Sequence, residues 1–578
     1  MMRTLLRALI GLGTILLWAG LLWAGTPANA RDQLVIGTTQ FPSTLHPSID
    51  SMLAKTYVNE MTQRPFTTYD PNWQLVCLLC TELPTIENGK AKIEDLPPGF
   101  KRDAGTTFCK SADPALATKG MAVTYTIQPN ATWGDGTPVT TDDVMFTYEV
   151  GKNEKSGVTN SELYRRIVKI DVIDKKTFVL HWDRIDFGYN GINDFLLLPA
   201  HLERAAFGDD PAEYHTRTLY NTDPTNPGLW FGPYRVASIE PGTQIVLEEN
   251  PTWWGEKPQI KRIVVKTIEN TSALEANLLS GAIDYIAGEA GLSIDEAIAF
   301  EQRHRDAYDV VYKPVIFFEH VTPNHDNPAL SDKRVRQALL YALDRQALSE
   351  QLFGGRQPVA DTDVSPLDWV HTDDVKKYKH DPAQAAALLD AAGWKLGSDG
   401  LRRDADGKPL AFELMSTAGE RTRELVEQVL QSQWKAIGIN VRIKNEPARV
   451  LFGETISKRK FTGLTLFAWL SSPENVPHTT LHSTMVPTEA NGWAGQNYAN
   501  YRNPELDDLM DCLEIELDRG KREQMWHKLQ AIYAEDLPDL PLYFRAQAYI
   551  MPKWLKGVRP TGHQYHSTLW AEQWRIEE

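Results

Sequence analysis

The chain contains 578 residues, and 76 Asp and Glu against 60 Lys and Arg give it a formal net charge of −16 at pH 7. This length is enough for two or three domains. The excess of negative charge argues against nucleic acid and against an anionic membrane surface as partners, because both repel an acidic protein.

Residues 1–30 have the features of a secretory signal peptide. Arg3 and Arg7 precede an apolar run that reaches Trp23, and residues 28–30 (ANA) form a small-x-small cleavage site. We expect cleavage after residue 30. The alternative is an uncleaved membrane anchor, for which the apolar run is long enough. No Cys follows the cleavage site, which argues against a lipoprotein. The sequence therefore predicts a periplasmic protein of a Gram-negative cell.

The chain has four cysteines, Cys77, Cys80, Cys109 and Cys512. An oxidising compartment favours disulfides, whereas a Cys-x-x-Cys pair such as Cys77 and Cys80 is also typical of redox-active or zinc sites. The second half of a zinc site is missing, and no thioredoxin-like βαβ pattern surrounds the pair. We predict one structural bridge, Cys80–Cys109, while the sequence leaves the connectivity open.

Residues 82–119 are polar and lack periodicity, so we expect an insertion or a long surface excursion there. Residues 131–150 (ATWGDGTPVTTDDVMFTYEV) then predict a strand–turn–helix corner. Gly136 can adopt the positive φ of a tight turn, and Thr140 or Thr141 can cap the helix, with acidic residues in its first turn. Paired acids here and at 507–508 therefore indicate helix starts rather than catalysis.

Further elements follow in chain order. Strands are expected at 176–182, 244–248 and 260–268, and a short helix at 272–279 that ends before Gly281. The second half begins near Phe317. Its expected elements are a helix capped by Ser331 or Asp332, a helix starting at Asp381-Pro382, a helix at 421–437 with a one-faced or edge strand after it, a helical hairpin from 501–511, and a strand at 537–544.

Six of these segments match motifs of one protein family in the family's order. The matching segments are 133–144, 226–234, 250–254, 335–345, 381–394 and 501–511. From about Ile36 to Phe544 the chain therefore resembles the family 5 extracellular solute-binding proteins, the dipeptide/oligopeptide-binding group of ABC importers.

The resemblance implies an α/β, two-lobed periplasmic binding protein fold of the class II type, with a hinge between the lobes. Lobe I would comprise 31–315 and 545–578, with an extra subdomain near 70–205, and lobe II would comprise 316–544. Ligand would be enclosed between the lobes and delivered to a membrane permease. The resemblance implies a monomer without a cofactor and without catalytic activity.

The ligand-binding residues follow from the resemblance by position. Peptide-binding members hold the ligand's ammonium group with an Asp shortly after a Trp, but here Trp469 is followed by Ser471 and Ser472. A buried ammonium without a carboxylate costs several kcal/mol, which argues against ordinary free-amino peptides as the ligand unless Glu474 or Glu319 takes the place of the missing Asp. The expected cleft residues are Gln40, Phe41, Phe317, Glu319, His320, Trp469, Ser471, Ser472, Trp493, Tyr498 and Tyr543.

With 17 Trp and 20 Tyr in the chain, any one aromatic side chain can equally be packing. We interpret Trp133, Trp254 and Trp394 as packing residues, because they lie in fold motifs. Arg336 and Asp344 are expected to have structural roles on the lobe II helix.

The sequence gives little support for functions other than solute binding. The sequence contains no G-x-S-x-G, H-E-x-x-H, P-loop or dinucleotide motif, so a secreted hydrolase is a remote alternative. His478 and His482 lie four residues apart, and His563 and His566 three apart, but exposed polar histidines explain both pairs better than a metal site. We expect an oligopeptide or peptide-like ligand, with a glycoside, opine, metal chelate or haem as the alternative cargo; a structural or chaperone-like role stays open.

Overall fold

The computed structural model describes residues 31–49, 52–102, 107–153, 155–268, 270–447, 450–491 and 495–577. The expected signal peptide lies outside these residues. Among them, no helix has the length and apolar character needed to span a membrane.

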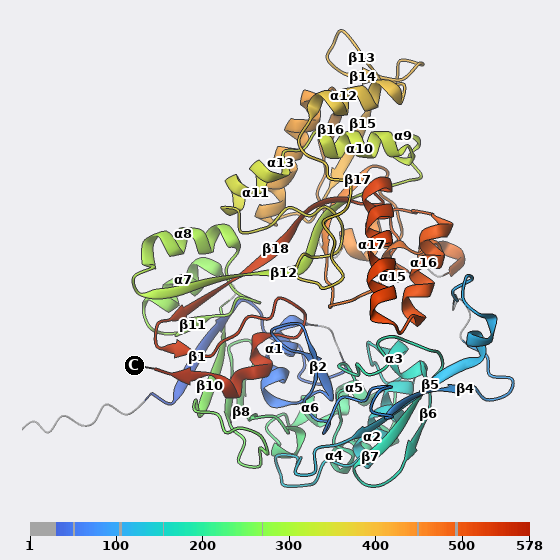
Figure 1. Ribbon diagram of the computed structural model, residues 1–578. Coiled ribbons are helices and arrows are strands. Elements are labelled where there is room, and N and C mark those ends of the chain that lie inside the picture. Colours follow the sequence, from blue (N-terminus) through green and yellow to red (C-terminus); the bar gives the residue numbers. More distant parts are fainter. Residues whose placement is uncertain are drawn as a thin grey trace, which may run out of the picture.

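A ten-stranded mixed sheet runs through both halves of the molecule (Figure 1). In sheet order its strands are β16 (Asn440–Ile443), β15 (Ala411–Met415), β17 (Leu464–Trp469), β12 (Tyr308–Pro323), β18 (Leu540–Pro552), β11 (Tyr285–Ile286), β1 (Gln33–Thr38), β10 (Arg262–Thr267), β9 (Gln244–Glu249) and β8 (Tyr234–Glu240). β1 is parallel to β10 and β11, whereas β12 is antiparallel to both β17 and β18. The long strands β12 and β18 therefore connect the two halves.

A separate four-stranded antiparallel sheet packs below this one in Figure 1. Its strands, in order, are β4 (Ala91–Asp95), β5 (Lys119–Thr126), β7 (Thr177–Trp182) and β6 (Ile167–Val172). β4 and the 3-10 helix η1 (Pro114–Thr118) lie in the segment 82–119, where the sequence showed no periodicity. The expected excursion therefore contributes an edge strand. Shorter pairings are β2 (Thr67–Tyr69) with β3 (Leu75–Cys77), β13 (Lys395–Leu396) with β14 (Arg402–Arg403), and β19 (Leu555–Lys556) with β20 (Arg575–Ile576).

Helices cover the sheets. The helices of the first half are α1 (Leu53–Thr62), α2 (Thr141–Lys152), α3 (Ser161–Arg165), α4 (Ala200–Asp209), α5 (Tyr214–Arg217), α6 (Leu219–Thr222), α7 (Thr271–Leu279) and α8 (Ile294–His304). Those of the second half are α9 (Pro328–Ser331), α10 (Lys333–Tyr341), α11 (Arg345–Phe353), α12 (Pro382–Ala391), α13 (Arg421–Ala436), α15 (His478–Leu481), α16 (Pro504–Ile515) and α17 (Arg519–Asp536).

The local signals that predicted helix ends correspond to observed caps. Thr140 and Asp143 form a capping box at the start of α2, although the strand expected before this turn is only an isolated bridge between Thr132 and Pro138. Gly281 follows α7 with a φ of 76°. Asp332 caps α10 by accepting a 2.9 Å hydrogen bond from the backbone N–H of Arg334.

The residues interpreted as structural pack in hydrophobic clusters, hydrogen-bond to backbone carbonyls or cap a helix. Trp133 is fully buried, and Trp254 and Trp394 pack against hydrophobic clusters. The Arg336 guanidinium donates hydrogen bonds to backbone carbonyls of two segments that are distant in sequence, including those of Leu330 (2.7 Å) and Leu537 (2.9 Å). Asp344 caps α11, so the long helix expected after residue 331 is interrupted and continues as a second helix.

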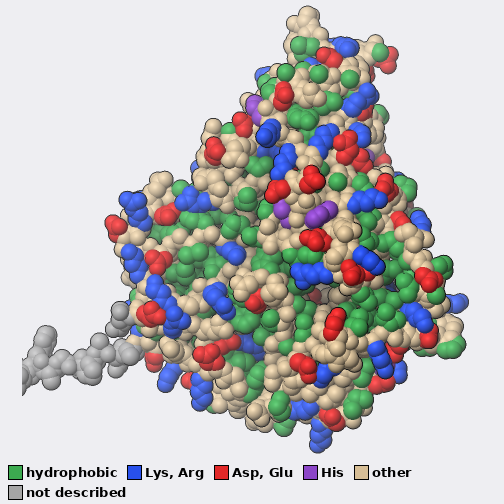
Figure 2. All heavy atoms as spheres, in the orientation of Figure 1, with side chains coloured by type: hydrophobic (Ala, Val, Ile, Leu, Met, Phe, Trp, Pro, Cys, Tyr) green, Lys and Arg blue, Asp and Glu red, His purple; other side chains and the backbone are tan. Residues whose placement is uncertain are grey.

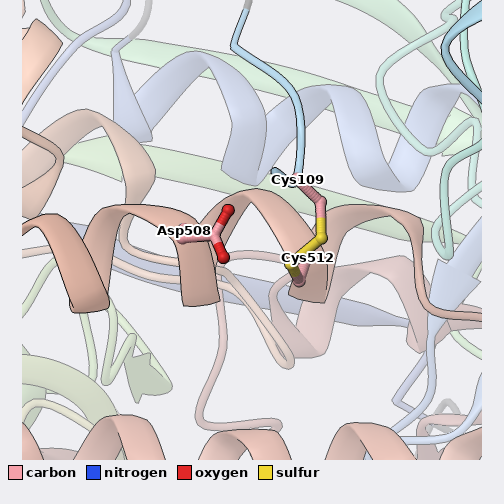
Figure 3. Close-up of side chains that lie close together, drawn as sticks. All are labelled: Cys109, Asp508 and Cys512. Carbon is pink, nitrogen blue, oxygen red and sulfur yellow. A yellow bond between two sulfur atoms is a disulfide. The ribbon is translucent and has the colours of Figure 1, made fainter. Parts of the chain in front are cut away.

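The predicted bridge Cys80–Cys109 is wrong, because the structure pairs Cys77 with Cys80 and Cys109 with Cys512. Cys77 ends β3 and Cys80 lies in the turn that follows, which places their Cα atoms 5.3 Å apart. Cys109 lies in a loop that rises toward α16, where its Cα is 4.6 Å from that of Cys512 (Figures 1 and 3). These two residues are 403 apart in sequence, so only the tertiary fold brings them together.

A buried ion triad joins β12, β18 and α13. Glu319 is fully buried, and its two carboxylate oxygens accept from Arg423 (2.7 Å) and from Arg545 (2.7 and 2.6 Å). Burial alone would raise the pKa of Glu319, but the guanidinium groups of Arg545 and Arg423 hold this pKa below its usual value. Glu319 is therefore an ionised group whose charge is already neutralised within the protein.

Replacing Glu319 by Gln leaves both guanidinium groups without their shared counter-charge. We expect Glu319→Gln to lower the free energy of unfolding by about 3–5 kcal/mol, measured by urea denaturation. The control is Glu149→Gln, because Glu149 and Arg204 form a 3.1 Å ion pair whose side chains are more than half exposed. Its expected loss is below about 1 kcal/mol, and equal losses in the two variants would contradict the role given to Glu319.

Candidate functional site

A cavity of about 430 Å³ lies where the two halves of the chain meet. The first half contributes α1 and the segments around 158–164 and 193–196, and the C-terminal segment 564–569 joins them. Phe317 of β12 and Leu470, directly after β17, contribute the opposite side. The cavity is thus bounded by segments that are far apart in sequence and brought together by the central sheet.

A second, smaller cavity of about 100 Å³ lies within the second half and shares Leu470 with the first. Its aromatic and polar lining includes Trp469, the last residue of β17, and Ser471 and Ser472, which follow the strand. The ring of Trp469 stacks on Tyr498 with 5.6 Å between centroids. The shared leucine makes the two cavities neighbouring parts of one candidate binding region.

Two carboxylates line the smaller cavity, both from the loop after α11. Asp363 has one carboxylate oxygen, Oδ1, that is buried and has no hydrogen-bond partner among the described residues, and burial raises the pKa of Asp363 to about 7. Asp368 accepts a 2.8 Å hydrogen bond from the backbone N–H of Glu474, and burial raises its pKa to about 6. An unpartnered acceptor on a residue that lines a cavity is a group that a ligand cation can satisfy.

The larger cavity has its own charged groups. Lys55 donates to the carbonyls of Pro47 (3.0 Å) and Ile49 (2.8 Å), which fixes its ammonium on the protein. Asp194 is exposed within the cavity lining, 3.4 Å from the amide nitrogen of Asn160. The surrounding protein raises the pKa of Asp194. Outside the cavities, acidic and basic side chains are interspersed over the face seen in Figure 2.

The structure brings together four of the expected cleft residues at these cavities, Phe317, Trp469, Ser471 and Ser472. Gln40 and Phe41 belong to the loop after β1 and line neither cavity; Phe41 packs against the hydrophobic cluster of the first half. Tyr498 lines neither cavity, but its ring stacks on that of Trp469. Trp493 lies outside the described residues.

The other three expected residues are buried beneath the cavities rather than lining them. Glu319 is held in the ion triad, and Tyr543 packs against Phe353 with 5.0 Å between ring centroids. His320 stacks on Phe318 at 4.9 Å. Simple strand alternation would place Phe317 and Glu319 on one face, but the β12–β18 register shifts on either side of Phe318 and Glu319, so position along the strand does not predict which side chains reach the cavities.

The two glutamates suggested as replacements for the missing Asp are both engaged. Glu319 is neutralised by its two arginines, and Glu474 contacts the indole nitrogen of Trp369 and lies 3.5 Å from the guanidinium of Arg522. Asp363 and Asp368 were missed by the sequence analysis, because their loop matches no motif and only tertiary folding brings it beside Trp469.

The interpretation of the two histidine pairs as exposed is wrong. His482, His563 and His566 are each at most 5% exposed, and His478 is partly buried. The first pair shares one face because residues 478–481 form the short helix α15. In the second pair, His566 lines the larger cavity and lies 3.2 Å from the carboxylate of Glu60, which lines the same cavity.

Comparisons with known proteins agree with this architecture. The family model described as bacterial extracellular solute-binding proteins, family 5 Middle, matches residues 112–491. The oligopeptide-binding protein AppA of Bacillus subtilis (strain 168) is 26% identical over 464 residues, which cover 78% of this chain and 81% of AppA. The probable D,D-dipeptide-binding periplasmic protein DdpA of Escherichia coli (strain K12) is 23% identical, with 92% of each chain covered.

Solved structures extend the similarity to nearly the whole chain. An oligopeptide-binding protein from Thermus thermophilus, complexed with a pentapeptide, has a TM-score of 0.72 and 29% identity, with 94% of this chain and 96% of that chain covered. NikA from Brucella suis, in complex with Fe(III)-EDTA, shares the fold with a TM-score of 0.75 at 18% identity, with 94% and 100% covered.

These similarities confirm the two-lobed α/β fold of periplasmic binding proteins expected from the sequence motifs. The family model spans more than half of the chain, and the matched segment includes β12, β17 and most of the residues around the smaller cavity. The chain therefore belongs to the bacterial extracellular solute-binding proteins, family 5.

Proposed function

We propose that the protein is the periplasmic substrate-binding subunit of an ABC importer, which captures an oligopeptide or peptide-like solute and delivers it to a membrane permease. It acts as a monomer, without a cofactor or catalysis, after cleavage of the signal peptide in a Gram-negative cell. The observation that carries the proposal is the pair of adjoining cavities that meet at Leu470 between the two halves of the chain. The relatives described as peptide-binding proteins support the choice of ligand.

In this proposal lobe I comprises residues 31–315 and 545–578, and lobe II comprises 316–544. The four-stranded sheet of β4–β7 belongs to the subdomain near 70–205. The lobes are connected through β12 and β18, whose pairing is interrupted by register shifts between Pro314 and Phe318 and between Glu319 and His320. Such irregular positions in long strands are where hinge bending requires the least loss of ladder hydrogen bonds.

Asp363 is the proposed partner of the peptide ammonium group. Its unpartnered Oδ1 lies at the cavity that also contains Ser471 and Ser472, which occupy the segment where other family members carry an Asp. A carboxylate supplied by the loop after α11 would thus replace the carboxylate missing from the segment after β17. A bound ammonium favours the ionised carboxylate and so lowers the raised pKa of Asp363.

The test is the affinity of Asp363→Asn for short peptides, measured by isothermal titration calorimetry with free-amino and N-acetylated pentapeptides. We expect the variant to bind free-amino peptides at least about tenfold more weakly, because a buried ion pair loses one partner. Binding of acetylated peptides stays unchanged. The control Asp374→Asn removes an exposed carboxylate of the same loop and leaves both affinities unchanged.

The same site predicts a pH dependence. The pKa of Asp363 is raised to about 7, so the ligand-free carboxyl group takes up a proton as the pH falls below that value. Wild-type affinity for free-amino peptides therefore decreases between about pH 7 and pH 5, whereas that of Asp363→Asn stays flat. If the wild-type protein binds neither free-amino nor acetylated peptides, the peptide proposal is contradicted and a non-peptide cargo is favoured.

If Asp363→Asn loses the same affinity for both peptide types, only the role of Asp363 is contradicted and the peptide proposal stands.

The disulfide Cys109–Cys512 crosses between the proposed lobes, since Cys109 belongs to the subdomain loop and Cys512 to α16 of lobe II. Neighbouring contacts cross at the same place, including the backbone N–H of Lys110 on Asp508 (2.6 Å; Figure 3 shows Asp508 beside the bridge) and that of Phe187 on the Glu514 carbonyl (2.9 Å). The bridge therefore limits how far the lobes can open.

Removing this bridge should let the two lobes of the ligand-free protein move further apart. We expect the double variant Cys109→Ser, Cys512→Ser to show a larger radius of gyration than wild type by small-angle X-ray scattering without ligand. The matched control is Cys77→Ser, Cys80→Ser, which removes a bridge of sequence separation 3 within one lobe and leaves the radius unchanged. Equal radii for all three proteins would show that the bridge does not limit opening.

A further inference from the structure

We propose that His478, His482 and Asp511 form a binding site for a divalent transition cation such as Zn²⁺, separate from the solute-binding cavities. His478 and His482 are the first residue of α15 and the residue that follows its end, and Asp511 lies on the neighbouring helix α16. None of the three lines either cavity. The site would hold a structural ion rather than cargo.

The two imidazole rings bring the same nitrogen near one carboxylate oxygen. Their centroids are 4.3 Å apart and the ring planes are nearly parallel, at 16°, so one ring has to turn about its Cβ–Cγ bond before both Nε2 lone pairs meet at one ion. The Nε2 atoms of His478 and His482 lie 3.5 and 3.6 Å from Oδ1 of Asp511. One ligand atom from each of the three residues lies within 4.8 Å of the others.

These separations match the edges of a metal coordination polyhedron. Ligands at about 2.0–2.2 Å from a tetrahedral Zn²⁺ are about 3.3–3.6 Å from one another. A direct hydrogen bond would instead place a nitrogen about 2.9 Å from its acceptor. The distances from Asp511 Oδ1 to the two nitrogens therefore suit a shared cation better than two hydrogen bonds.

A buried nitrogen lacks a partner at this position. His482 is 3% exposed, and its Nε2 has no hydrogen-bond partner within the described ranges of the chain. Leaving such a group unsatisfied costs about 1–3 kcal/mol. A cation bound through the Nε2 lone pair removes this cost, provided that the ring proton is on Nδ1, where the hydroxyl of Thr484 lies 2.7 Å away and can accept it.

The surroundings favour a cation and complete the ligand set. Asp507 Oδ1 lies 4.0 Å from Nε2 of His482 and accepts a 2.9 Å hydrogen bond from the backbone N–H of Ser483. The Thr107 hydroxyl donates to Asp511 Oδ1 at 2.5 Å and lies 3.1 Å from Nε2 of His478. The three protein ligands would leave one tetrahedral position for water.

The chemistry of the donors selects the class of metal. The adjacent Cys109, Asp508 and Cys512 are also within ligand distance of one another, but both sulfur atoms are used in the disulfide (Figure 3). The remaining donors are two imidazoles and one carboxylate. This set suits Zn²⁺, Co²⁺ or Ni²⁺ rather than Ca²⁺ or Mg²⁺, which prefer oxygen ligands.

The location gives the ion a consequence for the solute site. Pro477, Thr479 and Thr480 line the smaller cavity, so α15 presents its histidines to the metal and its neighbouring residues to the cavity. A bound cation would fix this wall against α16. Coordination through His478 Nε2 would replace the 3.1 Å contact of this nitrogen with the hydroxyl of Thr107, which comes from the other half of the molecule.

The test uses the mature protein with both disulfides intact, confirmed by the absence of free thiols, after chelator treatment and dialysis. Co²⁺ is titrated while visible absorption is recorded, followed by displacement with Zn²⁺. We expect one equivalent of Co²⁺ with tetrahedral d–d bands, and at least tenfold weaker binding in His478→Gln, His482→Gln and Asp511→Asn. His380→Gln, a partly exposed histidine 3.6 Å from Asp344, is the matched control and retains full binding.

Binding that is absent in wild type, or unchanged in the three variants, would overturn the proposal. X-ray absorption at the zinc edge of wild type gives an answer that needs no variant: imidazole and oxygen ligands support the site, whereas sulfur or oxygen ligands alone contradict it. Peptide affinity is measured separately on the same samples. The metal site and the peptide-binding proposal can therefore fail independently.

Discussion

The pairing of β12 with β18 holds both halves of the molecule in one sheet, and the buried triad of Glu319, Arg423 and Arg545 fixes that pairing at its centre. The ladder is irregular at the same place, where its register shifts on either side of Phe318 and Glu319. Phe317 lies at this irregular segment and lines the larger cavity. The position of the cavity thus depends on the charge pairing beneath it.

A second connection between the halves is formed by the Cys109–Cys512 bridge. Together with the strand pair it ties the lobes at two separate places, whereas a hinge alone would leave the mouth of the cleft free. Ligand can shift such a system toward closure only by binding the closed form more tightly than the open form. If the bridge limits opening as proposed, less conformational freedom is lost when the lobes close, which favours binding affinity.

Local and nonlocal features differ in how far the sequence predicts them. N-caps such as Thr140 and Asp332 depend only on residues within three positions of the cap. The helix end at Gly281 depends on the positive φ that glycine itself allows. Both kinds of helix end could therefore be predicted from the sequence. Motif order predicted the fold class and the segment around Trp469. The disulfide partner of Cys109, the approach of Asp363 to the smaller cavity and the burial of both histidine pairs depend on contacts between distant segments, which no local pattern encodes.

Native mass spectrometry of the mature protein purified from a periplasmic extract would show whether the cleft between the halves holds a solute. We expect a ladder of added masses that fragment as peptides. A single added mass of a non-peptide compound would contradict the peptide assignment and identify the cargo. Protein that stays bare after exposure to a broad pool of peptides would contradict the claim that this cleft captures peptides.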